Sequence, residues 1–152
     1  PYHRSRNAAL LLGQLRRKAG DRMLDRLVGD FAFAIWDAER RNLFCARDHF
    51  GIKPFYFVRY GAHVLLSNDI TALRQHPSVS DRLHEPAVAD FLAYGINLDE
   101  AATAFADIRR LPPGRSLRFA RDSQSEPRSY RQLWPEQPIR YSDRRDYREH
   151  FL

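Results

Sequence analysis

Hydrophobic and polar positions along the chain predict a mixture of helices and short strands. Residues 8–19 carry apolar side chains three and four residues apart, as an amphipathic helix does, and a short second helix is expected around Met23 and Leu24. In Phe31–Trp36, by contrast, both alternating sets of side chains are apolar, which predicts a strand covered on both faces. A polar turn over 37–42 then leads to an antiparallel partner strand at 43–46.

The rest of the chain adds short elements separated by glycine and proline. The pattern predicts a hairpin over 54–60 and 62–66, a short helix over 70–75 capped by Ser67, Asn68 or Asp69, a helix over 85–95, and a strand over 115–119 after the Leu-Pro-Pro-Gly turn at 111–114. A polar loop is expected over 121–128. A last helix would begin at Ser142 or Asp143. We interpret that helix as the start of a further domain rather than as a frayed tail.

Composition narrows the class of protein. At 152 residues the chain suits one domain, and its single cysteine favours a reducing, cytoplasmic setting without disulfides. The net charge of +6 comes mostly from arginine, but the arginines are spread along the chain beside acids, as in Asp21-Arg22. This pattern favours a solvated surface over a nucleic-acid-binding face, and no apolar run is long enough to span a membrane.

A charged loop with glycine and proline follows the second strand and holds the candidate site residues, which are Arg47, Asp48, Gly51, Lys53 and Pro54. Two interpretations are open. The residues could support an adjacent substrate site or a contact with another domain, or they could brace the loop, with an Arg47–Asp48 ion pair around the flexible Gly51. We favour bracing and predict no catalytic or substrate-binding residue in this stretch.

Neither the cysteine nor the histidines suggest a reactive centre. Cys45 lies inside a predicted strand, so we expect a buried, inert thiol rather than a nucleophile. The six histidines are scattered singly, without the spacing of metal ligands, and we predict no metal site.

Several segments in order resemble one enzyme family. The segments GDFAFAIWD, LFCARDHFGIKPFYF, LLSNDITALRQHP and TAFADIRRLPPGRSL, followed by Tyr130 and Trp134, are similar to the second half of the N-terminal glutaminase domain of glutamine-dependent asparagine synthetases. The element Arg47–Tyr56, of the form RDxFGxKPxY, is long and specific. Related asparagine-synthetase-like cyclases act in peptide maturation, and this stretch does not separate them from the synthetases.

The resemblance implies a class II glutamine amidotransferase. Its fold would be an α+β, N-terminal-nucleophile-type sandwich of antiparallel sheets between helices, in which a first-residue cysteine hydrolyses glutamine. The ammonia would pass to the protein's own C-terminal synthetase domain, which uses ATP and Mg²⁺ to amidate aspartate. No cofactor is expected in the present stretch, and a homodimer is possible in such a family.

Departures from the family pattern define two hypotheses. The chain begins with Pro1 rather than cysteine, the Asn-Gly of the oxyanion hole has no counterpart, and Ala8 stands near the family's substrate-binding acid. We therefore expect residues 1–137 to form a partial amidotransferase domain that is inactive alone, and residues 138–152 to begin a synthetase domain. The alternative is a non-catalytic scaffold that docks a synthetase or cyclase partner.

Overall fold

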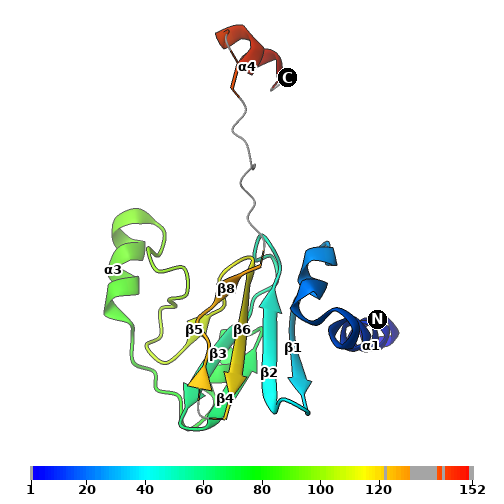
Figure 1. The fold of residues 1–152 in the computed structure, drawn as a ribbon. Coiled ribbons are helices and arrows are strands. Elements are labelled where there is room, and N and C mark those ends of the chain that lie inside the picture. The colour runs from blue at the N-terminus through cyan, green and yellow to red at the C-terminus, as the bar shows by residue number, and fades with distance from the viewer. Residues whose placement is uncertain (1, 122, 131–139, 142, 151–152) are drawn as a thin grey trace.

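The computed structural model describes residues 2–121, 123–130, 140–141 and 143–150, and it confirms the predicted α+β class (Figure 1). The helical elements are α1 (Tyr2–Ala19), the 3-10 helix η1 (Gly20–Arg26), α2 (Ile70–Arg74), α3 (Glu85–Tyr94) and α4 (Arg144–His150). The strands are β1 (Ala32–Asp37), β2 (Asn42–Arg47), β3 (Tyr56–Tyr60), β4 (His63–Ser67), β5 (Arg109–Arg110), β6 (Arg115–Ala120), β7 (Ser123–Gln124) and β8 (Arg128–Ser129).

Within the described residues, the strands form two antiparallel sheets. In the first sheet β1 pairs with β2 and β2 with β6, and both β7 and β8 pair with β6. In the second sheet β3 lies between β4 and β5. The register of the first hairpin pairs Ala32 with Arg47, so β2 ends in the charged loop at the point where β1 begins.

The part of the chain that the structure describes has three apolar cores. One lies between the sheets and includes Cys45 and Phe57. A second lies between the first sheet and the α1–η1 segment, and a third packs α2 against the second sheet. Strand β2 serves two of these cores, because alternate side chains point to opposite faces: Cys45 faces the second sheet, while Phe44 and Ala46 face η1.

The prediction that residues 31–36 form a strand covered on both faces is wrong for β1. Phe33 and Ile35 pack against the η1 core, but Ala34 is exposed and Trp36 keeps 60% of its surface accessible. The physical reason is position, since β1 is an outer strand of its sheet and no described element covers its second face beyond Ala32. The strand covered on both faces is its partner β2.

Most other elements follow the predicted pattern, with shifted ends. Asp69 caps α2 by accepting a hydrogen bond from the Thr71 amide at 2.8 Å, and α3 has proline in its first turn and ends at Gly95, whose φ is 73°. Three differences stand out: α1 begins at Tyr2, the second helix is a 3-10 helix, and the expected polar loop over 121–128 contains β7. The predicted landmark Trp134 and the proposed boundary at residue 137 lie outside the described residues.

Candidate functional site

The loop after β2 is built around the carboxylate of Asp48, which is only 1% exposed. Its Oδ1 accepts hydrogen bonds from the amides of Phe50 and Ile52 at 3.1 and 2.9 Å, and its Oδ2 accepts one from the Lys53 amide at 2.9 Å. The backbone of Asp48 is held as well, since its amide donates to the Phe31 carbonyl and its carbonyl accepts from Gly114. The Asp48 side chain thus holds the whole turn together.

Arg47 holds the same loop as a hydrogen-bond donor, whereas Asp48 is an acceptor. Its Nε donates to the Lys53 carbonyl at 2.7 Å, Nη1 donates to the Leu111 carbonyl at 2.7 Å, and Nη2 donates to the Gly51 carbonyl. The guanidinium therefore ties the charged loop to the Leu-Pro-Pro-Gly turn, more than 60 residues later in the chain. A lysine could not replace it, because its single ammonium lacks the planar fork that reaches three carbonyls.

The predicted ion pair between Arg47 and Asp48 does not form. Neighbouring residues at a strand end point to different sides, so Arg47 binds carbonyl oxygens while Asp48 binds amides. Burial by itself would raise the pKa of Asp48, but the hydrogen bonds from the loop amides outweigh it and lower that pKa below its ordinary value. Burial also lowers the pKa of Arg47, which stays protonated at neutral pH.

Gly51 is required by both its backbone and its surroundings. Its φ of 67° lies in the left-handed region. A Cβ at this position would lie 2.8 Å from Cγ of Pro113 and 3.0 Å from Cζ of Arg47. The glycine lets the guanidinium and the proline turn close over the loop.

Comparison with known proteins places the chain in a family. The glutamine amidotransferase domain family matches residues 3–131, which is most of the chain. The chain belongs to that family. It is similar to asparagine synthetase [glutamine-hydrolyzing] 3 of Bacillus subtilis, with 33% identity over 65% of this chain, and to asparagine synthetase [glutamine-hydrolyzing] 2 of the same organism, with 29% identity over 68% of this chain.

The similarity extends to a fungal amidase but covers little of any of these relatives. Amidase chyE of Penicillium rubens is 28% identical over 76% of this chain. The chain spans 16% and 14% of the lengths of the two Bacillus subtilis synthetases, and 16% of the length of the amidase. What these relatives share with the chain is therefore the amidotransferase region.

The remaining candidate residues of this amidotransferase segment differ in their contacts. The Lys53 side chain is exposed, and the loop uses only the backbone amide and carbonyl of this residue. Pro54 is half-buried beside the core residue Phe55. Lys53 and Pro54 thus shape or border the loop, whereas Arg47 and Asp48 supply its side-chain hydrogen bonds.

Cys45 has none of the properties of an amidotransferase nucleophile. Its side chain is fully buried in the core between the two sheets, and burial raises the pKa of its thiol to about 12. Its backbone nitrogen is part of a peptide bond, so no free amine is available to activate the sulfur. The described residues contain no group of three or more histidine, cysteine, aspartate or glutamate side chains that could hold a metal ion.

Two aromatic residues support the loop from behind, and the sequence did not single them out for this role. The Tyr130 hydroxyl donates to the Arg47 carbonyl at 2.6 Å, and burial raises the pKa of Tyr130 to about 12. The ring of His49 packs edge-on against both Tyr130 and Phe31, at centroid distances of 5.2 and 6.3 Å. Only the relation between strand ends brings residues 47 and 130 together, and no local pattern signals it.

A hollow of about 490 Å³ lies beside the loop and is widely open to solvent. It is lined by residues of the charged loop, of α3, of the segment after α3, and of β5 with the proline turn that follows it. These residues are Arg47, Phe50, Gly51, Phe91, Gly95, Ile96, Asn97, Glu100, Arg110 and Pro113. Two guanidiniums and several apolar side chains therefore share one concave surface. This hollow was not predicted, because its lining comes from segments far apart in the chain.

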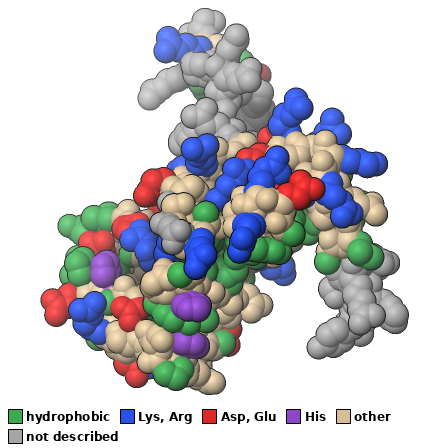
Figure 2. All heavy atoms as spheres, turned by 60° about the horizontal axis from the view of Figure 1, so that its bottom comes forward, with side chains coloured by type: hydrophobic (Ala, Val, Ile, Leu, Met, Phe, Trp, Pro, Cys, Tyr) green, Lys and Arg blue, Asp and Glu red, His purple; other side chains and the backbone are tan. Residues whose placement is uncertain are grey.

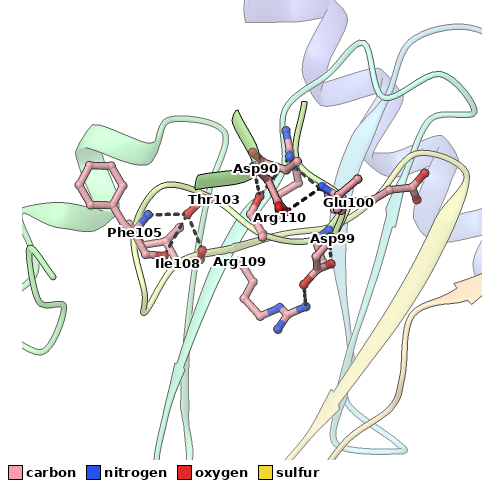
Figure 3. Close-up of polar contacts among 12 residues, drawn as sticks. Asp90, Asp99, Glu100, Thr103, Phe105, Ile108, Arg109 and Arg110 are labelled. Carbon is pink, nitrogen blue, oxygen red and sulfur yellow. Dashed lines mark hydrogen bonds and ion pairs between the residues drawn. The ribbon is translucent and has the colours of Figure 1, made fainter. Parts of the chain in front are cut away.

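The segment from 97 to 110 is held in shape by its own polar contacts (Figure 3). Thr103 Oγ1 donates to the Ile108 carbonyl at 2.6 Å and accepts from the Phe105 amide. Arg109 forms an ion pair of 3.2 Å with Asp99. Arg110 instead donates from Nε to the Glu100 carbonyl and from Nη2 to the Ala102 carbonyl, so its side chain is fixed at the hollow without a carboxylate partner.

Charge is distributed unevenly over the surface, and Figure 2 shows many lysine and arginine side chains gathered over one part of the visible face. Asp21 accepts two of these arginines: Arg16, five residues before it, and Arg118, 97 residues after it. These pairs join α1 and β6 to η1. Within the described residues no helix is both long and apolar enough to cross a membrane.

Proposed function

We propose that the chain is part of a glutamine-hydrolysing asparagine synthetase. In that protein, the complete amidotransferase domain would hydrolyse glutamine and supply ammonia for the ATP-dependent amidation of aspartate. The observation that carries the proposal is the loop of Arg47, Asp48 and Gly51, which joins the two proline- and glycine-bearing segments of the family match into one hydrogen-bonded unit. The relatives named as glutamine-hydrolysing synthetases support it.

The role assigned to the present residues is structural. The loop binds its own backbone with nearly every polar group it has, so it offers a rigid wall to a site rather than a reacting group. In this proposal, ATP and Mg²⁺ act in the synthetase unit. The N-terminal-nucleophile fold and a cytoplasmic location are further parts of the proposal.

The proposal predicts that residues 1–152 alone release no ammonia from glutamine. Removing a nucleophile lowers an enzyme's rate by orders of magnitude. The test compares ammonia release by residues 1–152 with that by the protein expressed from its complete reading frame, using glutamate dehydrogenase to detect ammonia. Glutamine hydrolysis by the complete protein and none by residues 1–152 is expected, and ammonia release by residues 1–152 alone would refute the assignment.

The Cys45→Ala variant of the complete protein is the matched control. Because Cys45 is buried between the sheets and lacks a free amine, its replacement should leave the rate of glutamine hydrolysis within about twofold of the original. A loss of activity in a variant that still folds would make Cys45 the nucleophile and overturn the proposed role of this chain.

The alternative function is a non-catalytic scaffold that docks a synthetase or cyclase. Ala8 near the position of the family's substrate-binding acid favours it, since an alanine cannot pair with the amine of glutamine. Isothermal titration of the complete protein with glutamine separates the two functions. Binding favours the enzyme, and absence of both binding and hydrolysis favours the scaffold.

A further inference from the structure

A small hollow of about 80 Å³ lies beside η1, on the face of the first sheet that is turned away from the second sheet. Strand β6 fixes this placement, because Leu117 belongs to the core between the sheets and its neighbours Ser116 and Arg118 therefore face the other way. The polar lining is completed by Asp21, Ser125 and Arg128. We call the hollow formed by Asp21, Ser116, Arg118, Ser125 and Arg128 the serine hollow.

Strand pairing brings these polar side chains together. The register of β6 with β8 sets Arg128 opposite Ser116, and Figure 1 shows the two strands side by side. The Ser125 amide donates to the Arg118 carbonyl at 2.9 Å, and the Ser125 hydroxyl accepts from the Arg118 amide at 3.0 Å. The serine hollow is therefore built on hydrogen-bonded backbone.

The serine hollow has more hydrogen-bond donors than the described residues use. Because the Ser125 hydroxyl accepts from an amide, its own O–H remains able to donate. Arg118 donates from Nη2 to Asp21, whereas its Nη1 has no acceptor and its Nε is buried without one among these residues. The Ser116 hydroxyl and the Arg128 guanidinium make no hydrogen bond within the described part of the chain.

Positive charge exceeds negative charge at the serine hollow. Its acid, Asp21, is shared between Arg16 and Arg118. Burial alone would raise the pKa of Asp21, but the two guanidiniums outweigh burial and lower that pKa, so the carboxylate is ionised at neutral pH. Arg128 has no carboxylate partner among the described residues, and its charge remains available to a ligand.

This chemistry fits a phosphate group. Phosphate is a strong acceptor on several oxygens, and it can use donors that approach from different strands, whereas a planar carboxylate has only two oxygens to offer. The volume of about 80 Å³ corresponds to roughly two or three water molecules at ~30 Å³ each, which is enough for one phosphate group. A buried donor without an acceptor, such as Arg118 Nε, is uncommon in folded proteins and favours an acceptor-rich ligand nearby.

We propose that the serine hollow is a binding site for a phosphate group, either of inorganic phosphate or of a small phosphate ester. The donors to the phosphate oxygens are the Arg128 guanidinium, Arg118 Nη1 and the hydroxyls of Ser116 and Ser125. The site uses no residue of the charged loop after β2. It is independent of the proposed function, because it takes no part in glutamine hydrolysis.

Isothermal titration calorimetry tests the site in the protein expressed from its complete reading frame, at constant ionic strength. Inorganic phosphate, glycerol 3-phosphate and acetate are titrated separately. We expect one of the two phosphate compounds to bind with a dissociation constant of about 1 mM or below, and the tighter of the two identifies the source of the phosphate group. Acetate that binds as tightly as phosphate would overturn the assignment, because a carboxylate would then satisfy the site equally well.

Single substitutions locate the binding. Arg128→Gln should weaken it about tenfold or more, since hydrogen bonds to charged groups contribute this much, and the exposed position protects the fold. Ser116→Ala, which leaves the net charge unchanged, should weaken binding about threefold or more. Arg26→Gln is the matched control, because Arg26 is an exposed arginine that lines a different hollow, and it should change the affinity by less than about twofold. Equal affinities in all three variants would refute the site.

Crystals of the same protein, grown without phosphate or sulfate and soaked in selenate, show the position of the anion directly. We expect an anomalous selenium peak in the serine hollow, in contact with Arg128 and at least one of the two serine hydroxyls. Water molecules alone in the hollow would contradict the proposal. Selenate in the hollow without measurable binding of either phosphate compound in solution would mean an adventitious ion only, and it would overturn the proposal as well.

Discussion

The charged loop after β2 and the α3 face, meaning the exposed Phe91, Leu92 and Ile96, use their residues in opposite ways. The loop buries charged groups and satisfies them, since the Asp48 carboxylate is covered by amides and the Arg47 guanidinium by carbonyls. The α3 face leaves apolar groups such as Leu92 in water. Polar residues in one region thus complete the fold internally, while apolar residues in the other contribute nothing to it.

This difference separates the residues that mark the family from residues that add little to the fold. The most recognisable stretch of the sequence contains the charged loop after β2. Removing the side chains of Arg47 and Asp48 should unfold the domain, because buried backbone amides and carbonyls would lose their hydrogen-bond partners. The α3 face carries no comparable signature, and its removal should leave the fold intact. Mutations in the two regions therefore test this contrast.

The largest effect is expected from Asp48→Ala. Three loop amides would lose their acceptor, and Arg47 would lose the nearby negative charge that raises its pKa. We expect a loss of about 3–5 kcal/mol in the free energy of unfolding. Urea denaturation followed by circular dichroism measures it. A loss below about 1 kcal/mol would show that the loop is held without this carboxylate.

The same carboxylate should make stability depend on pH. Burial alone would raise the pKa of Asp48, but the loop amides hold it below its ordinary value. Because the pKa of Asp48 is lower in the folded state, the carboxylate stabilises the protein fully at pH values above the pKa of the unfolded chain, which is about 4. This contribution is lost as the pH falls through the pKa of the folded state. Urea denaturation between pH 7 and 3 should therefore show a flatter acid decline for Asp48→Asn than for the original chain.

Gly51→Ala should be the next largest change, with a loss of about 2–3 kcal/mol in the free energy of unfolding. The new methyl group would combine a left-handed backbone with contacts under 3.1 Å to Pro113 and Arg47. Gly61→Ala is the matched control, because Gly61 has a φ of 56° but no atom near its missing Cβ. It should lose only about 1 kcal/mol. Equal losses in the two variants would mean that close packing around Gly51 is unimportant.

Tyr130→Phe removes one hydroxyl from behind the loop and should lower the free energy of unfolding by about 1 kcal/mol. The phenyl ring keeps its contacts with His49 and Phe31, so the change isolates the hydrogen bond to the Arg47 carbonyl. Thermal denaturation by circular dichroism provides the measurement. No change in melting temperature would indicate that Tyr130 supports the loop by packing alone.

The smallest effect is expected on the α3 face. Leu92→Asp should alter the free energy of unfolding by less than about 0.5 kcal/mol, because the leucine is 80% exposed. Val28→Asp, at an equally exposed site, should behave alike. A loss above about 1 kcal/mol for Leu92→Asp would show that α3 packs against the domain and is no free surface.

Local patterns in the sequence predicted the elements well where one residue type sets the geometry. The Asp69 cap of α2, the proline and glycine at the two ends of α3, and the buried Cys45 are such cases. The strand covered on both faces was predicted to be β1 but is its neighbour β2. Apolar composition alone does not show which strand lies at the edge of a sheet. Trp36 is exposed for this reason.

The site was predicted in its residues but not in its contacts. Arg47 and Asp48 were singled out by charge and neighbouring glycine and proline, yet their partners are backbone groups, which a sequence does not display. The links to Leu111 and Tyr130 depend on strand pairing across more than 60 residues. The pattern predicted the helix α3 but not the exposure of its apolar residues, since a helical stripe does not reveal whether anything covers it.

Because Cys45 is buried, its reaction with a thiol reagent can report how often the domain opens. The chain has one cysteine, and its sulfur lies inside β2, between β1 and β6, at the centre of the first sheet. A thiol reagent in native buffer can reach it only in molecules whose sheets have separated, so the labelling rate counts those molecules directly. The same cysteine that takes no part in the proposed chemistry would thus report, without any introduced probe, how often this domain comes apart.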